Sequence, residues 1–81
     1  MKYSNFGRII GRNKDFYIIK CSTGEYHIIE SSDELEIESI ISWDNSNSCF
    51  YDESYSLDIS ALMQWEYISL QEAISTLKSL Y

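Results

Sequence analysis

Residues 7–29, GRIIGRNKDFYIIKCSTGEYHII, decide the fold, because pairs of isoleucines recur in them between residues that are typical of turns. These doublets begin at Ile9, Ile18 and Ile28, and a fourth begins at Ile40. A spacing of 9 to 12 residues is typical of short consecutive strands joined by hairpins. Gly, Asn, Ser and Asp favour turns, and they mark three segments where the chain is expected to reverse: 11–14, 22–24 and 31–33.

The doublets also predict that both faces of the sheet are covered. Adjacent side chains of a strand point to opposite faces, so each doublet places one isoleucine on either side. A curved antiparallel sheet or small barrel covers one face with itself, and a packed helix covers part of the other. Gly7 and Gly11 suit the sharp coiling that such a sheet needs in its first strand.

Over residues 57–67, the side chains expected on the buried face alternate with those expected on the other face, as in a half-buried strand. We predict a strand of about nine residues there, because alternation with a period of two is typical of strands. A helix over the same residues is the alternative, because Ala, Leu, Met and Gln favour helices. The residues before it, 45–56, are interpreted as a loop, a short strand and a second loop. The face expected to be buried carries Leu57, Ile59, Ala61, Met63 and Trp65.

The end of the chain has the signals of a helix over residues 70–80. Ser69 followed by Glu72 forms a capping box, and Lys78 lies in the last turn, where its charge complements the helix dipole. A helix this short is unstable alone in water, so we expect it to dock on the sheet. Its apolar stripe is Leu70, Ala73, Ile74 and Leu77.

These elements predict one domain over residues 1–81, of the α+β class and mainly β. We expect a curved antiparallel sheet or a small five-stranded barrel with one C-terminal helix. The order of elements resembles SH3-like and OB-like barrels, most closely between Gly7 and Trp43. This resemblance is one of pattern, and it implies no function.

Several classes of protein are disfavoured by the composition. No run reaches the ~20 apolar residues that a membrane-spanning helix needs, and the first residues do not combine a basic region with a following apolar stretch. We therefore expect a cytoplasmic protein in which Cys21 and Cys49 are reduced thiols. Cys21, His27 and Cys49 lack the spacing of zinc ligands, and neither a phosphate loop nor an activated nucleophile is recognisable. The sequence predicts no enzyme, no metal and no cofactor.

Charge is distributed unevenly along the chain. The first 20 residues hold five cations and one acid, whereas residues 21–77 hold twelve acids and no Lys or Arg, and the net charge is −7. This balance disfavours direct binding to nucleic acid or to an anionic membrane, which needs clustered Lys and Arg. The acids form either an ordinary solvated surface or a face matched to a basic partner, which speeds association and rejects wrong partners.

The densest acidic segment is residues 33–38. In an extended segment Glu34, Glu36 and Glu38 share one face, and Leu35 and Ile37 point inward. Such a row of carboxylates is either a solvated strand edge or a strip that binds Lys and Arg of another protein. We take these three glutamates as candidate partner-binding residues.

Aromatic residues among acids form the second candidate surface. Tyr51, Tyr55 and Trp65 lie close in sequence to Asp52 and Glu53. Aromatic anchors with charged neighbours are typical of protein interfaces, although packing in the core is the alternative for the aromatic side chains. We add all five to the candidate partner-binding residues.

The function predicted from these features is a small acidic inhibitor of a basic protein that acts on nucleic acid. An immunity protein for a bacterial nuclease toxin fits this prediction, and so does a phage-type inhibitor of a restriction or CRISPR nuclease. The alternative from another class is a small nucleic-acid-binding barrel, in which Phe16 and Tyr17 stack on bases. Its cations are Arg8, Arg12, Lys14 and Lys20.

Overall fold

Two hairpins join the first three strands, as predicted, although the first turn lies later in the chain than the predicted segment 11–14. In the first hairpin Asn13 pairs with Phe16, so the turn consists of Lys14 and Asp15, and Lys14 has a φ of 54°. In the second hairpin the left-handed position is occupied by Gly24, with a φ of 101°. Glycine adopts this conformation without the steric cost that a side chain brings.

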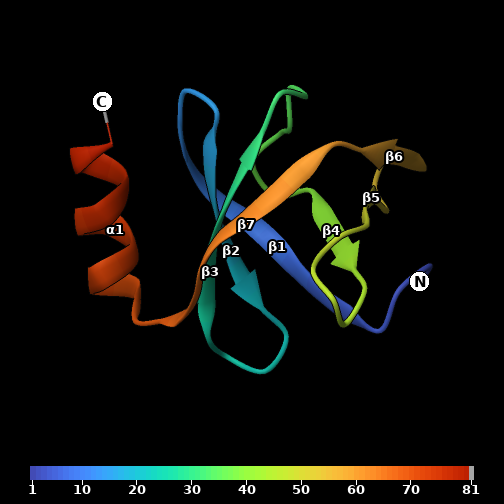
Figure 1. Ribbon diagram of the computed structural model, residues 1–81, viewed down its shortest axis with the longest axis horizontal. Coiled ribbons are helices and arrows are strands. Elements are labelled where there is room, and N and C mark those ends of the chain that lie inside the picture. The colour runs from blue at the N-terminus through green and yellow to red at the C-terminus, as the bar shows by residue number, and fades with distance from the viewer. Residues whose placement is uncertain (81) are drawn as a thin grey trace.

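The computed structural model describes residues 1–80, which form one antiparallel sheet and a C-terminal helix (Figure 1). The order across the sheet is β6-β5-β4-β1-β2-β3-β7. The elements are β1 Asn5–Asn13, β2 Phe16–Cys21, β3 Tyr26–Ser31, β4 Ile40–Trp43, β5 Phe50–Asp52, β6 Leu57–Ile59, β7 Ala61–Ile68 and α1 Leu70–Ser79.

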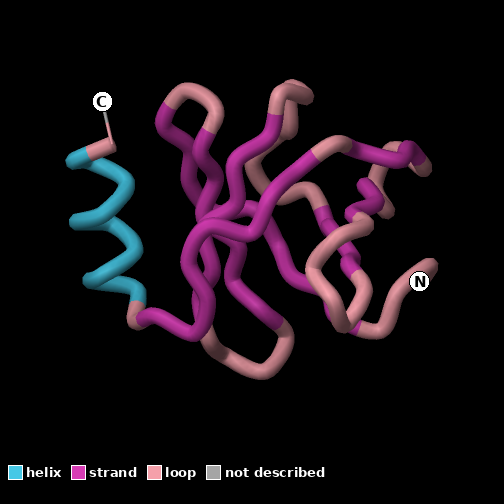
Figure 2. Tube along the Cα trace, viewed as in Figure 1, coloured by secondary structure: helices cyan, strands magenta, loops and turns pink. Residues whose placement is uncertain are grey.

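The sheet curls until its two edges meet at one corner. β6 and β7 are the edge strands, yet only Ser60 separates them in sequence. Figure 2 shows the chain passing from one edge to the other through this short connection. The hydroxyl of Ser31 donates a hydrogen bond of 2.6 Å to the carbonyl of Ser60 and ties β3 to the corner.

This architecture confirms a mainly β fold with a curved antiparallel sheet and one C-terminal helix. The predicted number of five strands is wrong, because the sheet has seven strands. The strand prediction for residues 57–67 is confirmed and the helical alternative is wrong, although the segment forms β6 and β7 rather than one strand. The resemblance to SH3-like and OB-like barrels stays a prediction.

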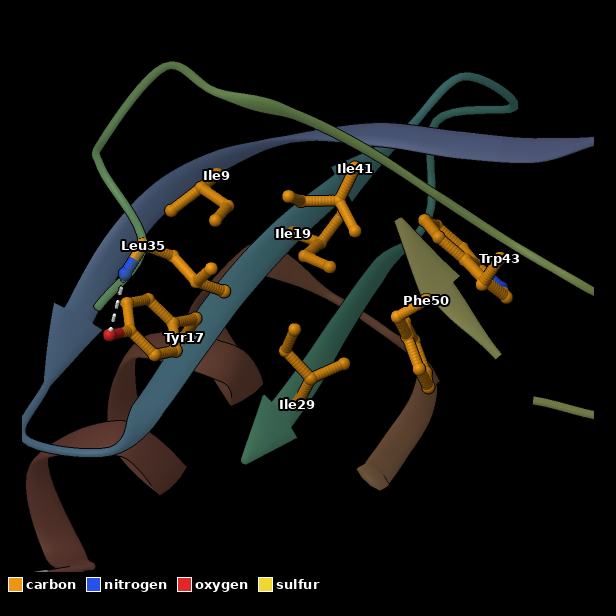
Figure 3. Close-up of a cluster of buried hydrophobic side chains, with 8 residues drawn as sticks. All are labelled: Ile9, Tyr17, Ile19, Ile29, Leu35, Ile41, Trp43 and Phe50. Carbon is orange, nitrogen blue, oxygen red and sulfur yellow. Dashed lines mark hydrogen bonds between the residues drawn. The ribbon is translucent and has the colours of Figure 1, made fainter. Parts of the chain in front are cut away.

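The isoleucine doublets divide between two hydrophobic cores, as predicted. Inside the curl, Ile9 and Ile19 are fully buried in one cluster, which Figure 3 shows. On the outer face, Ile18 and Ile28 pack against α1. The other members of the inner cluster are Tyr17, Ile29, Leu35, Ile41, Trp43 and Phe50.

Gly7 allows the close approach of β1 and β2 that the curl requires. A Cβ atom at this position would lie 2.5 Å from both the Cγ2 atom of Ile19 and the carbonyl oxygen of Lys20. Gly11 follows an irregularity in the pairing of the same two strands. A β-bulge of this kind bends a strand and increases its twist.

The helix begins and docks as the sequence predicts. Ser69 and Glu72 form the capping box, and the helix ends at Ser79, one residue before the predicted end. Ala73 and Leu77 are buried against the sheet. The predicted apolar stripe is only partly covered, because Leu70 and Ile74 remain 40% and 41% exposed.

Candidate functional site

The segment between β3 and β4 is a loop, and the predicted row of glutamates is therefore wrong as a strand face. The hydroxyl of buried Tyr17 accepts a hydrogen bond of 3.1 Å from the N–H of Leu35 (Figure 3) and donates one of 3.1 Å to the carbonyl of Asp33. Leu35 is buried beneath the loop. Ile37, which was also expected to point inward, is 48% exposed, and Glu38 turns the chain with a φ of 79°.

The three glutamates of this loop point to different neighbours. The guanidinium of Arg12 donates two hydrogen bonds to Glu34, of 3.1 and 2.8 Å, and they hold the pKa of Glu34 below its ordinary value. The hydroxyl of Tyr55 donates a hydrogen bond of 2.6 Å to Glu36, which raises the pKa of Tyr55. Glu38 takes part in neither contact, and its carboxylate lies 3.6 Å from the guanidinium of Arg8.

Asp52 is buried, so it does not lie at the surface as a partner-binding residue requires. Its Oδ1 atom accepts hydrogen bonds from the N–H groups of Ser54 and Tyr55, at 3.0 and 3.2 Å. An aspartate that caps the following turn in this way fixes the backbone locally. Asp52 thereby sets the position of Tyr55.

The loop and the β5–β6 hairpin enclose a concave surface of about 290 Å³, which we call the acidic groove. Five carboxylates line it, and its lining contains no Lys or Arg. Exposed apolar surface lies among them, because Tyr55 is 53% and Leu57 is 57% exposed. The lining residues are Asp33, Glu34, Leu35, Glu36, Asp52, Tyr55, Leu57, Asp58 and Ile59.

The chain's own cations partly neutralise the groove. Arg12 pairs with Glu34 and Lys2 pairs with Asp58, each at 2.8 Å. Both carboxylates stay largely exposed, with 81% and 77% of the side-chain surface open to solvent. Exposed ion pairs of this kind contribute little to stability, so an incoming cation can compete for either carboxylate.

Two further candidate residues lie beside the groove at the N-terminal segment. The backbone N–H of Lys2 donates a hydrogen bond of 2.7 Å to Glu53, and its ammonium group lies 4.7 Å from the ring centre of Tyr51. The hydroxyl of Ser42 also donates to Glu53, at 2.7 Å, and this bond is the main cause that lowers the pKa of Glu53. Glu53 and Tyr51 thus both contact Lys2, the first through its main chain and the second through its ammonium group.

The structure therefore gathers most of the predicted site residues, although not all of them. Trp65 lies on β7, at the opposite edge of the sheet from β5 and β6, and outside the lining of the groove. Sequence reasoning missed Leu57 and Asp58 as site residues, because Leu57 was assigned to the buried face. No signal in the sequence marks the break at Ser60, because the alternation of apolar residues continues from Leu57 to Trp65.

A second, polar cleft of about 310 Å³ lies at one end of the curled sheet, with His27 and Cys21 in its lining. His27 is buried, and its Nδ1 atom accepts a hydrogen bond of 3.3 Å from the N–H of Tyr67. Burial lowers the pKa of His27, which favours the neutral imidazole. Within residues 1–80, no group of three or more His, Cys, Asp and Glu side chains is placed to hold a metal ion. Both cysteines are free thiols.

The alternative as a nucleic-acid-binding barrel is less well supported by the geometry. Tyr17 is fully buried, so its ring cannot stack on a base. Arg12 is paired with Glu34, and Arg8 lies 3.6 Å from Glu38. The cations of the first strand therefore face acids of the same chain.

Comparison with protein-family models, with curated proteins and with solved structures found no match to this chain. No helix in the described part of the chain is long and apolar enough to cross a membrane. The cytoplasmic location stays a prediction, and the function is argued from the geometry of the site.

Proposed function

We propose that this protein is an acidic inhibitor that binds a basic, nucleic-acid-acting protein through the acidic groove. The observation that supports the proposal is the juxtaposition of four exposed carboxylates, Asp33, Glu34, Glu36 and Asp58, with the exposed side chains of Tyr55 and Leu57. An immunity protein for a nuclease toxin is the form of this function that we favour. Inhibition of a restriction or CRISPR nuclease requires the same surface.

The charges of the groove match a surface that is rich in Lys and Arg. Among residues 1–80, ion pairs engage Glu34 and Asp58, whereas the exposed Asp33 and Glu36 have none. Proteins that bind nucleic acid carry clustered cations for the phosphates. An acidic face is attracted to such clusters over several ångströms and raises the rate of association.

The apolar residues of the groove contribute affinity that charge alone does not provide. Leu57 and Tyr55 expose more than half of their surface on the rim of the groove. Burial of apolar and aromatic side chains at the centre of an interface contributes most of the affinity, whereas charges at the rim contribute specificity and speed. The groove combines both kinds of contact in one place.

The test of the proposal is capture of the partner from the source cell with a matched control. The variant Glu34→Lys/Glu36→Lys reverses charge in the groove, and Glu25→Lys/Glu66→Lys makes the same change in charge in the polar cleft. We expect the wild type and the control to retain a basic protein that cleaves nucleic acid, and the groove variant to lose it. The purified partner should be inhibited at a stoichiometry of one to one. Retention by all three proteins, or a partner without action on nucleic acid, contradicts the proposal.

A further inference from the structure

The N-terminal segment places a lysine of this chain in a site made by three other residues. Residues 1–4 form no strand, and Figure 1 places the N-terminus on the side of the sheet that carries β5 and β6. The ammonium group of Lys2 lies 2.8 Å from Oδ1 of Asp58 and 4.7 Å from the ring centre of Tyr51. The backbone N–H of Lys2 donates to Glu53 at 2.7 Å. We call Tyr51, Glu53 and Asp58 the lysine cage.

The cage is built by the sheet and not by its occupant. Tyr51 on β5 and Asp58 on β6 are directly paired across the two strands. Paired residues of antiparallel strands place their side chains side by side on one face. The hydroxyl of Ser42 on β4 donates to the same Oε2 atom of Glu53 that accepts from Lys2. We therefore expect the three groups to keep their positions when Lys2 is replaced.

The chemistry of the cage suits a basic residue, and the residue that it holds in this structure is a lysine. A carboxylate beside the ammonium group supplies a charge-assisted hydrogen bond, and the face of a tyrosine ring attracts a cation. Glu53 accepts from the main chain of the same residue, so the cage contacts a lysine as part of a polypeptide. Asp58 also lines the acidic groove, which makes the two surfaces continuous.

We propose that the lysine cage is a binding site for a lysine side chain of the basic partner, and that Lys2 occupies it as an intramolecular competitor. This inference rests on the proposed function for the source of the incoming lysine. The ion pair of Lys2 is exposed, with 44% and 77% of the two side chains open to solvent. Such a pair is easily replaced by an equivalent one.

The test uses N-acetyl-lysine N-methylamide as the probe, titrated into the full chain and followed through the amide NMR signals of Tyr51 and Asp58. We expect Lys2→Ala to bind the probe with a Kd about fivefold lower than the wild type, because removal of a competing ion pair and cation–π contact raises the fraction of empty cage. Lys20→Ala removes the same charge from a different concavity, beside Arg8, and should behave as the wild type.

Two further measurements test whether binding needs the ammonium group of the probe and the residues of the cage. The norleucine analogue of the probe lacks the ammonium group and should not bind. In the Lys2→Ala background, Asp58→Asn should abolish the gain in affinity for the probe, and Tyr51→Leu should reduce this gain. Asp58→Asn alters an exposed side chain and keeps the test valid if Tyr51→Leu does not fold. Equal affinity of Lys2→Ala and wild type, or shifts confined to other residues, overturns the inference.

Failure of this inference is distinguishable from failure of the proposed function. If Lys2→Ala gains no affinity while Glu34→Lys/Glu36→Lys still loses the captured partner, the cage is an ordinary surface ion pair and only the inference falls. If Lys2→Ala gains affinity for the probe but no basic partner is captured, the lysine site stands and the proposed function falls.

Discussion

The backbone N–H of Tyr67 donates a hydrogen bond of 3.3 Å to Nδ1 of His27, at a position where β7 bulges past β3. Tyr67 has a φ of 56°, a conformation that costs a residue with a side chain free energy. Nδ1 can accept this bond only when it carries no proton. The geometry of the bulge therefore depends on a neutral histidine.

Stability is predicted to fall as the pH decreases from 7.5 to 5.5. Burial is the main cause that lowers the pKa of His27 below 6.5, and the charges of Glu66 and Glu25 oppose it. The unfolded chain therefore takes up a proton at higher pH than the native protein does, which favours unfolding as the pH falls. Denaturant titrations at both pH values should show that the free energy of unfolding falls less for His27→Gln than for the wild type. An equal loss in both proteins contradicts the prediction. Glu34 and Glu53 do not interfere, because their lowered pKa values place their titration below 4.5.

The helix α1 is predicted to stabilise the fold through its buried face. Leu77→Ala removes a buried side chain and should cost about 2–4 kcal/mol of the free energy of unfolding. Ser69→Ala removes the cap at about 1 kcal/mol. Ile74→Ala serves as the control, because Ile74 is 41% exposed and its loss should cost clearly less than that of Leu77. Urea unfolding midpoints measure the three effects, and equal small shifts mean that α1 is not docked.

Asp52 is predicted to act on stability and not directly on binding. Asp52→Ala leaves the N–H groups of Ser54 and Tyr55 without their acceptor, which should cost about 1–3 kcal/mol. Glu36→Gln, a substitution of an exposed residue in the same groove, should leave the free energy of unfolding within about 0.5 kcal/mol of that of the wild type. A midpoint for Asp52→Ala that equals that of Glu36→Gln shows that the cap is dispensable.

Folding is predicted not to need the cysteines. Cys49 is exposed and Cys21 is partly buried, and both are free thiols. The double variant Cys21→Ser/Cys49→Ser should therefore give the circular dichroism spectrum of the wild type. In the native protein a thiol reagent should modify Cys49 rapidly and Cys21 slowly. An unfolded double variant, or a native protein without reactive thiol, contradicts the expectation.

The local patterns of the sequence predicted the parts of the fold that depend on neighbouring residues. Alternation of side chains predicted that each doublet places one isoleucine on either face, as Ile18 and Ile19 do, because the period of a strand is fixed by its backbone. The capping box at Ser69 located the start of α1, because it depends only on contacts between residues three apart in sequence. The meeting of the sheet edges at Ser60 was not predictable, because it depends on how seven strands twist together.

The site was predicted by composition and corrected by long-range contacts. The row of Glu34, Glu36 and Glu38 was inferred from alternation, but the hydroxyl of Tyr17 holds the backbone of the loop in a different path. Tyr17 lies 18 residues before Leu35, so no pattern within the loop reveals this contact. The burial of Asp52 had a local signal, because aspartate before a turn commonly bonds to the following N–H groups.

The central claim is that the acidic groove draws in a basic partner, and the rate of association with the captured partner tests it most directly. The rate should be measured at low and at severalfold higher salt for the wild type, Glu34→Lys/Glu36→Lys and Glu25→Lys/Glu66→Lys. We predict that the groove variant associates about tenfold more slowly at low salt and loses most of the salt dependence, since it lacks the attraction that ions screen. The control pair should change less on both counts. The same rate and the same salt dependence for the groove variant and the wild type would show that these carboxylates are only a solvated surface.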